Sequence, residues 1–332
     1  MRAMVLNSFK PIEQNPLELI EMPIPQPASD ELLVRVKVCG ICHTDLHTIE
    51  GELPEVRAPI IPGHQVVGIV ESLGEECSRF KIGERVGVAW LYSACGRCEF
   101  CLSGKENLCL EGRFTGYHTN GGYAEYMVVP EKFAYAIPAF FSDEQAAPLL
   151  CAGIIGFRAL RLSGIKPGQT LGLYGFGASA HIALQVAVDW GCQVYVFSRS
   201  VEHRKLARVL GAVWTGSAEG QPPAKLNGSI IFAPAGEMVL KALRNTEKGG
   251  TVALAGITMT PIPEMSYLEY IYHERILRSV ANATRLDGEE LLNTAVKIPI
   301  KTIAKVFPLE EANHVLRMLK AGKINGAAVL KI

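Results

Sequence analysis

The pattern of apolar and polar positions changes its character along the chain. The N-terminal part alternates apolar and polar residues in short runs, most clearly over residues 32–38, and Pro- and Gly-bearing turns separate these runs, which predicts β-strands. Further along, strand-length apolar runs alternate with helical patterns, as is typical of a parallel sheet. The C-terminal segment returns to the first domain. We therefore predict an α/β protein in which a doubly wound parallel sheet, residues 153–281, is inserted into a β-rich domain of residues 1–152 and 282–332.

Length and charge narrow the class of protein. A chain of 332 residues is longer than one hydrophobic core usually supports, which agrees with two domains. Its 33 basic and 33 acidic side chains cancel, so electrostatics gives no reason to expect a nucleic acid or an anionic membrane as partner. The N-terminus lacks the apolar segment of a signal peptide, and no apolar run is long enough to span a bilayer. The odd number of nine Cys, mostly at metal-type spacings, favours a reducing compartment. We predict a soluble, cytoplasmic protein.

Residues 40–47 gather a thiol, two imidazoles, a hydroxyl and a carboxylate directly after a predicted strand. A single Cys is more often a small buried hydrophobe than a ligand, so Cys42 needs partners elsewhere in the chain. His64 follows a glycine and precedes a strand-type run, and Cys151 lies in an apolar segment with no neighbouring Cys. Two thiolates and one imidazole leave a fourth tetrahedral position open, which is the pattern of a catalytic zinc.

Four further cysteines follow one another at C-x2-C-x2-C-x7-C spacing, namely Cys95, Cys98, Cys101 and Cys109. Two-residue gaps let successive sulfurs turn toward one ion, and four thiolates close a tetrahedron without an open position. This spacing predicts a structural zinc, with iron and a set of free thiols as the competing interpretations. Removal of the metal is expected to loosen this part of the chain.

A glycine turn joins a strand-type run to an apolar helical pattern. Gly175 permits a tight turn, and Gly177 lets backbone N–H groups approach a pyrophosphate at the helix N-terminus. Ala180 takes the third position of this fingerprint as a permitted variant. The order of strand, turn and helix predicts a dinucleotide site, and the competing interpretation is an ordinary strand–helix turn.

The end of the following strand bears on the choice of cofactor. A protein that prefers NAD usually has Asp or Glu here to bind the ribose hydroxyls, whereas this chain has Ser198 and Arg199. No carboxylate repels a 2′-phosphate, and a guanidinium can bind it at about 1.5–3 kcal/mol per charged hydrogen bond. We therefore predict NADP as the favoured cofactor. The alternative is that Arg199 points to water and the protein uses NAD or both.

Three motifs together resemble a known family. The runs G-I-C-H-T-D-L-H, G-H-Q-V-V-G and L-L-C-A-G-I, which begin at Gly40, Gly63 and Leu149, are similar to those of the zinc-dependent alcohol dehydrogenases of the medium-chain dehydrogenase/reductase superfamily, and the resemblance covers essentially the whole chain. It implies a GroES-like catalytic domain and a Rossmann domain with the site in the cleft between them, two zinc ions per chain, and a homodimer or homotetramer. It also implies hydride transfer between a small primary alcohol or aldehyde and a nicotinamide cofactor.

The same resemblance implies roles for residues near the first zinc. Thr44 matches the hydroxyl that receives the alcohol proton, and His47 matches the next member of the relay, although an ordinary loop histidine is an alternative. Asp45 matches the carboxylate that orients the histidine ligand, and His43 matches the group that faces the cofactor pyrophosphate. Trp90 stands where the family lines the substrate pocket with an aromatic ring, which would favour small substrates; interdomain packing is its alternative.

Two positions depart from the family pattern. The residue after the histidine ligand is usually Glu, thought to approach the metal during ligand exchange, and here it is Gln65. We expect retained activity with altered exchange kinetics. Many relatives place Arg after a C-terminal Gly, where it reaches the cofactor phosphates, whereas Gly326 is followed by Ala327. This substitution removes one expected contact with the cofactor.

Two other functions compete with the leading hypothesis. One is a related zinc reductase or dehydrogenase of the superfamily with another carbonyl or a polyol as substrate. The other is a non-enzymatic protein that binds zinc and a nucleotide. Against the latter, a purely structural protein has no physical need for the full set of metal ligands and relay groups. Four residues receive no role, namely Cys39, Cys77, His181 and Cys192.

Overall fold

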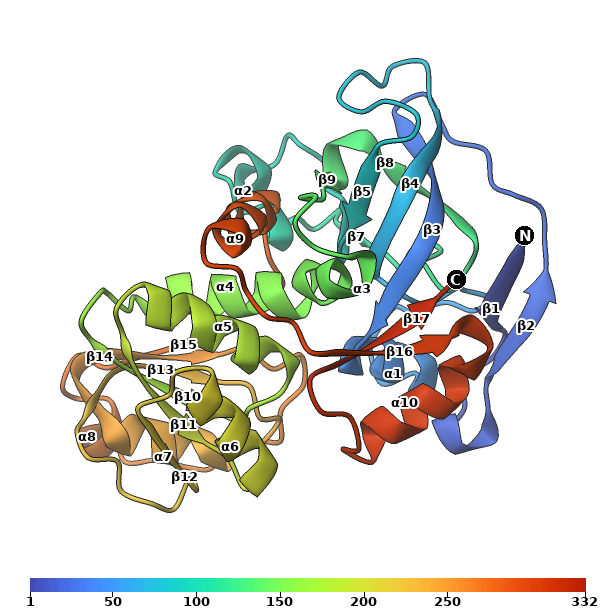
Figure 1. Ribbon diagram of the computed structural model, residues 1–332. Coiled ribbons are helices and arrows are strands. Elements are labelled where there is room, and N and C mark those ends of the chain that lie inside the picture. Colours follow the sequence, from blue (N-terminus) through green and yellow to red (C-terminus); the bar gives the residue numbers. More distant parts are fainter. The chain divides into compact units, whose positions relative to one another are not determined.

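The computed structural model describes residues 1–332 (Figure 1). The chain folds into two compact units. The first unit comprises Met1–Cys151, Thr284–Leu292 and Lys301–Ile332, and the second comprises Ala152–Ala283 and Asn293–Ile300. The helix α9 (Arg285–Lys297) therefore begins in the first unit and ends in the second.

The first unit is built on a seven-stranded sheet. In spatial order its strands are β16 (Ala304–Pro308), β17 (Ala327–Lys331), β3 (Glu31–Ile41), β4 (Gln65–Leu73), β5 (Arg85–Val88) and β9 (Ala134–Ala136), with β8 (Tyr126–Pro130) paired to β3. All pairs are antiparallel except β16 with β17. Antiparallel pairing allows one face to be solvated, which explains why apolar and basic residues alternate along β3.

Smaller elements complete this unit. Two two-stranded sheets pair β1 (Arg2–Leu6) with β2 (Leu17–Glu21) and β6 (Leu91–Ser93) with β7 (Arg113–Phe114). The α-helices are α1 (His43–Glu50), α2 (Glu99–Leu102), α3 (Asp143–Ala146) and α10 (Ala312–Lys320). The 3-10 helices are η1 (Ile12–Gln14), η2 (Glu106–Leu108), η3 (Glu131–Phe133), η4 (Ala147–Leu150) and η5 (Leu309–Glu311). The core joins the buried faces of β1, β3 and β4 to α1 and α10.

The second unit is a six-stranded parallel sheet. Its strands are, in spatial order, β12 (Trp214–Gly216), β11 (Gln193–Phe197), β10 (Thr170–Tyr174), β13 (Leu226–Ile231), β14 (Thr246–Leu254) and β15 (Ile276–Ser279). The chain builds outward from β10 to β12 and then returns to β13 on the other side of β10. This reversal marks a doubly wound sheet, in which ligands bind at the carboxyl ends of the strands beside the switch point.

Helices cover this sheet. They are α4 (Ala152–Ser163), α5 (Ala178–Asp189), α6 (Val201–Val209), α7 (Glu237–Asn245) and the short α8 (Tyr267–Tyr270). Residues of β10, β11 and β13 are buried almost throughout, as expected for parallel strands with helices on both faces. The predicted α/β fold, with a β-rich unit and a doubly wound parallel sheet, is confirmed.

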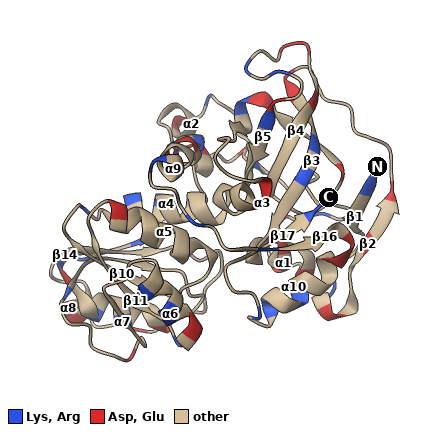
Figure 2. Ribbon diagram, in the orientation of Figure 1, with Lys and Arg blue, Asp and Glu red and all other residues tan.

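Charges of both signs are scattered over the elements of both units (Figure 2). Most ion pairs lie at the surface, such as Arg97 with Glu111 at 3.1 Å, and exposed pairs of this kind add little stability. No single helix has the length and apolarity needed to cross a bilayer. One bent pair of helical segments, Asp143–Leu150 and Ala152–Ser163, has the required length and composition when the two are taken together.

Candidate active site

The start of α1 fixes two of the predicted site residues. Cys42 is the N-cap residue in extended conformation, and its sulfur accepts a hydrogen bond from the backbone N–H of Thr44 at 3.3 Å. In return, Oδ2 of Asp45 accepts a hydrogen bond from the backbone N–H of Cys42 at 2.8 Å. This capping box holds both side chains at the helix N-terminus. The local sequence therefore determines where the thiol and the carboxylate lie.

A glycine turn delivers the second ligand. Gly63 has φ of +99°, and a Cβ there would lie 2.4 Å from the ring of Tyr123 and 2.8 Å from the sulfur of Cys39. Only glycine suits both this conformation and this close approach. His64 follows, fully buried, before the chain enters β4. Cys151 lies at the end of η4, directly before α4.

These three side chains converge within the first unit. The sulfur of Cys42 lies 3.3 Å from Nε2 of His64 and 4.0 Å from the sulfur of Cys151, and the ligating atoms all lie within 4.8 Å of one another. Tetrahedral zinc bonds of usual length set neighbouring sulfur atoms about 3.8 Å apart. The residues therefore fit one zinc ion, with a fourth position not filled by this group.

A carboxylate stands behind the imidazole. Nδ1 of His64 lies 3.0 Å from Oδ1 of Asp45, and both side chains are buried. Burial lowers the pKa of His64, but Asp45 and Cys42 outweigh it and raise the pKa to about 10. A hydrogen bond with Cys151 and burial also raise the pKa of the Cys42 thiol. A metal ion bound here would therefore displace protons.

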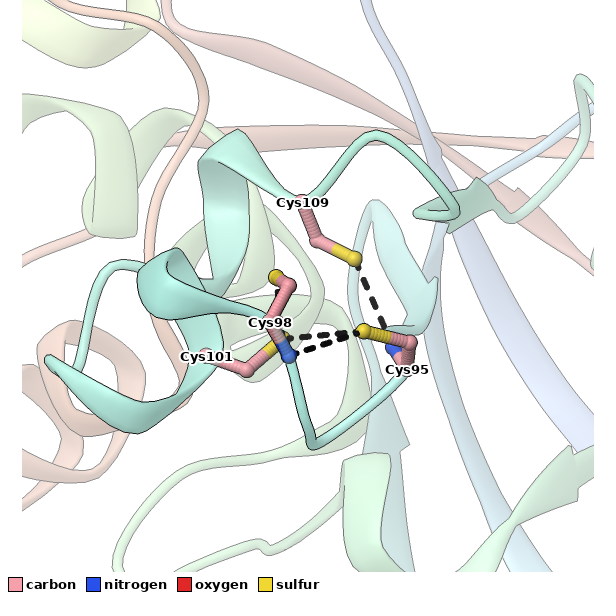
Figure 3. A group of neighbouring side chains, drawn as sticks. All are labelled: Cys95, Cys98, Cys101 and Cys109. Atoms are coloured by element: carbon pink, nitrogen blue, oxygen red, sulfur yellow. Dashed lines mark hydrogen bonds between the residues drawn. The ribbon is translucent and has the colours of Figure 1, made fainter.

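The four clustered cysteines also meet in space (Figure 3). They lie in the segment between β6 and β7 that contains α2 and η2. The sulfur of Cys101 lies 3.9 Å from that of Cys95 and 3.6 Å from that of Cys98. The sulfur of Cys109 accepts a hydrogen bond from the backbone N–H of Cys95 at 3.4 Å. Backbone N–H groups of Arg97 and Cys98 lower the pKa of Cys95 to about 7. The set fits a closed tetrahedral metal site.

The other site residues predicted between positions 40 and 47 lie on α1. Thr44 is buried, and His47 stands three residues further along the helix. Nδ1 of His47 contacts a carboxylate oxygen of Glu52. The rings of His43 and His47 lie 6.5 Å apart, and burial together with this neighbour lowers the pKa of His43.

Trp90 is part of an aromatic group next to the histidine ligand. The centroid of its ring lies 4.9 Å from that of His64, in a T-shaped arrangement, and 5.2 Å from that of Phe114, on which it stacks. The ring centroid of Tyr117 lies 5.5 Å away. These three neighbours all belong to the first unit. The side chain of His118 extends the group, 4.4 Å from Tyr117.

Sequence reasoning did not single out Glu52, Phe114, Tyr117 or His118. The aromatic run F-T-G-Y-H directly after the cysteine cluster was the available signal for the last three. Tyr117 and His118 also line a surface pocket of about 620 Å³. No sequence pattern indicates a role for Glu52. Its carboxylate contacts His47 because the chain turns at the end of α1.

The two departures from the family pattern lie in the sheet of the first unit. Gln65 is buried, packs against Gly40, and its Nε2 has no hydrogen-bond partner. Ala327 begins β17 and is buried after Gly326, whose φ is +80°.

The glycine turn of the second unit joins β10 to α5. Gly175 has φ of +88°, and a Cβ there would lie 3.0 Å from the backbone nitrogen of Ala233. Gly177 is the N-cap residue of α5, and no atom lies within 4 Å of where its Cβ would be. This turn therefore leaves space for a phosphate at the helix N-terminus. Ala180 is fully buried within α5.

The predicted cofactor-selecting residues follow β11. Ser198 is buried, and its hydroxyl accepts a hydrogen bond from the backbone N–H of Ser200 at 3.3 Å. The hydroxyl of Ser200 in turn accepts one from the backbone N–H of His203 at 3.2 Å and caps α6. Arg199 lies between the two serines with its side chain exposed. The segment is a tight turn that presents a guanidinium rather than a carboxylate.

Comparison with known proteins identifies the class. Residues 28–139 match the family model for the alcohol dehydrogenase GroES-like domain, which confirms the predicted type of the first unit. The probable alcohol dehydrogenase AdhA of Mycobacterium tuberculosis is 46% identical over 97% of this chain and 94% of its own. The chain therefore belongs to the alcohol dehydrogenase family of the medium-chain dehydrogenase/reductase superfamily, as the motifs predicted, and it is an oxidoreductase by descent.

Solved structures agree in fold. A cobalt- and zinc-bound thermostable alcohol dehydrogenase from Pyrobaculum aerophilum has a TM-score of 0.91 at 25% identity, covering 100% of this chain and 99% of that one. A structure from Sinorhizobium meliloti, described as a zinc-binding dehydrogenase bound to NADP, has a TM-score of 0.87 at 26% identity over 100% and 99% of the two chains.

Proposed function

We propose that the protein is a zinc-dependent alcohol dehydrogenase that transfers a hydride between a primary alcohol or aldehyde and a nicotinamide cofactor. The observation that carries this proposal is the convergence of Cys42, His64 and Cys151. Two thiols and an imidazole at this spacing suit a tetrahedral zinc with one position left for a substrate. The related alcohol dehydrogenase from Pyrobaculum is described as bound to cobalt and zinc, which supports a metal of this kind here.

When bound, the zinc supplies a Lewis acid that lowers the pKa of an alcohol oxygen. The chain's own groups handle the proton. We assign its acceptance to the hydroxyl of Thr44 and its onward transfer to His47, which lies one helical turn away on the same face of α1. Asp45 holds the ring of His64 so that Nε2 faces the two thiols.

The second unit binds the cofactor in this proposal. The backbone at Gly175 and Gly177 receives the pyrophosphate at the N-terminus of α5. Ser198 and Arg199 favour NADP, because they offer a hydroxyl and a guanidinium and no carboxylate. The Sinorhizobium relative described as bound to NADP supports this choice. NAD is the competing cofactor.

We assign a second, structural zinc to the four clustered cysteines shown in Figure 3. Four sulfurs leave no position for a substrate, so this ion orders the segment between β6 and β7 and takes no part in the reaction. The protein then holds two zinc ions per chain.

Steady-state rates with NADP and NAD test the proposal, using ethanol, benzyl alcohol and their aldehydes, with metal content measured on the same sample. We expect turnover with about two zinc ions per chain, faster with NADP and lost on chelation. Cys42→Ala and Cys151→Ala should abolish turnover while the protein stays folded. Cys77→Ala is the control, since this thiol bonds to backbone oxygens of Ser29 and Glu31. Normal activity in either ligand variant contradicts the metal mechanism.

A further inference from the structure

The turn after β11 depends on a second arginine. Arg204 lies in α6, four residues after the N-cap Ser200. Its Nη1 atom donates hydrogen bonds to the backbone oxygens of Ser198, at 2.6 Å, and of Arg199, at 3.1 Å. One guanidinium nitrogen thus donates to the carbonyl oxygens of the two residues that precede the N-cap.

The helix alone cannot make these contacts. The carbonyl groups of Ser198 and Arg199 lie before the N-cap, and no backbone N–H of α6 donates to either of them. Side chains in a helix lean toward its N-terminus, which lets Arg204 reach back over the turn. The helix dipole disfavours a positive charge near the helix N-terminus. The two hydrogen bonds to carbonyl oxygens offset this cost for the guanidinium of Arg204.

Charges around the turn are arranged to leave one guanidinium available. Glu202, the acidic residue in the first turn of α6, pairs with Lys205 at 3.1 Å. The side chain of Arg199 is exposed, and its backbone oxygen is what Arg204 binds. The positive charge of Arg199 is therefore not cancelled by a neighbouring carboxylate.

We infer that Arg204 is a positioning residue for cofactor selection: it holds the Ser198–Ser200 turn so that the guanidinium of Arg199 faces the 2′-phosphate of NADP. This inference rests on the proposed NADP preference and deepens it. In this inference Arg204 acts through Arg199: its Nη1 donates to the carbonyl groups of the turn. NAD lacks the 2′-phosphate, so its binding does not depend on this turn to the same extent.

Dissociation constants for NADP and NAD test the inference, measured by calorimetry on the wild type, Arg199→Gln, Arg204→Gln and the double variant. We expect Arg199→Gln to weaken NADP about 10- to 100-fold, as for loss of a charged hydrogen-bond pair, and Arg204→Gln to weaken it roughly 10-fold. The double variant should match Arg199→Gln alone, because two residues that act through one contact are not additive. NAD affinity should change no more than about twofold, the ordinary scatter for surface substitutions.

A matched control lies on the same helix. Arg208 donates from Nε to the hydroxyl of Thr215 at 3.0 Å and does not contact the turn. Arg208→Gln should therefore leave both dissociation constants unchanged. Arg204→Lys keeps a donor and should restore part of the NADP affinity.

Hydrogen exchange without cofactor gives an independent readout. Arg204→Gln should speed amide exchange over residues 198–203, whereas Arg199→Gln and Arg208→Gln should not. Additive losses in the double variant would overturn the inference and make Arg204 a phosphate ligand itself; equal losses for NAD and NADP would also overturn it. If Arg199→Gln leaves the ratio of the two constants unchanged, the proposed NADP preference fails, and the exchange rates still report whether Arg204 holds the turn.

Discussion

Nδ1 of His64 lies 3.0 Å from Oδ1 of Asp45, and the other carboxylate oxygen of Asp45 accepts the backbone N–H of Cys42 at 2.8 Å. One buried carboxylate therefore touches two of the three residues that converge at the candidate catalytic zinc site. It fixes the direction of the imidazole and the position of the thiol at once.

Asp45→Asn should weaken binding of one zinc ion per chain about 10- to 100-fold, the usual effect of losing a carboxylate behind a ligating histidine. The amide keeps the shape of the side chain but not its charge. Zinc content after equilibration with a competing chelator measures the effect. Asp143→Asn is a suitable control, since Asp143 pairs with Arg85 at 2.6 Å and belongs to neither group of metal-type ligands. Full retention of both ions in Asp45→Asn would exclude this role.

The two cysteine groups should respond differently to substitution. Cys42→Ser removes a ligand from the three-residue group, so we expect activity to vanish with little change in the melting temperature. Cys101→Ser opens the four-sulfur group between β6 and β7, and we expect a lower melting temperature because a structural metal contributes folding free energy. Calorimetric melting and activity on the same samples check both outcomes. Equal melting temperatures for the two variants would count against a structural ion.

His181 predicts a pH dependence of stability. It is buried in α5, and burial lowers its pKa to about 4, against smaller opposing contributions from the backbone of Gly177 and Ala178. The unfolded pKa of histidine is about 6.5. At pH values between about 4 and 6.5, His181 therefore binds a proton in the unfolded chain but not in the folded chain. Stability should therefore fall as the pH drops from about 6.5 toward 4.

His181→Leu should reduce this acid sensitivity, because the unfolded chain then loses the proton-binding group. The difference in melting temperature between about pH 7.5 and about pH 5, on either side of the unfolded pKa, measures it. His314→Leu on α10 is the control, since His314 is exposed. An unchanged difference in His181→Leu would show that other groups govern the acid response.

Much of the candidate site could be predicted because its signals are local. The glycine at position 63, the capping residues around Cys42 and the two-residue gaps between cysteines each dictate a short stretch of backbone. The parallel sheet followed from the alternation of strand and helix patterns. These features need no knowledge of distant contacts.

Other features depend on contacts that the sequence does not encode locally. The placement of β17 beside β3 brings residues 328–331 against residues 38–41, and only the register of the sheet decides this. The pairing of His47 with Glu52 depends on how α1 ends at Gly51, in left-handed conformation. The hydrogen bonds of Arg204 to the carbonyl groups of Ser198 and Arg199 likewise depend on α6 beginning after Ser200.

Trp90 provides the last prediction. The centroid of its indole ring lies 4.9 Å from that of the nearly perpendicular His64 ring and 5.2 Å from that of the stacked Phe114 ring, so Trp90 occupies space beside a proposed zinc ligand. Trp90→Ala should raise kcat/KM for benzyl alcohol relative to ethanol by about 10-fold or more, because pocket contacts discriminate at about 1–3 kcal/mol per small group. Trp214→Ala is the matched control: Trp214 packs on Tyr195 and Phe197 in the second unit, so its loss should lower stability and leave the ratio unchanged. If both variants keep the wild-type ratio, Trp90 packs without shaping the pocket, and the limit on substrate size has to come from other side chains.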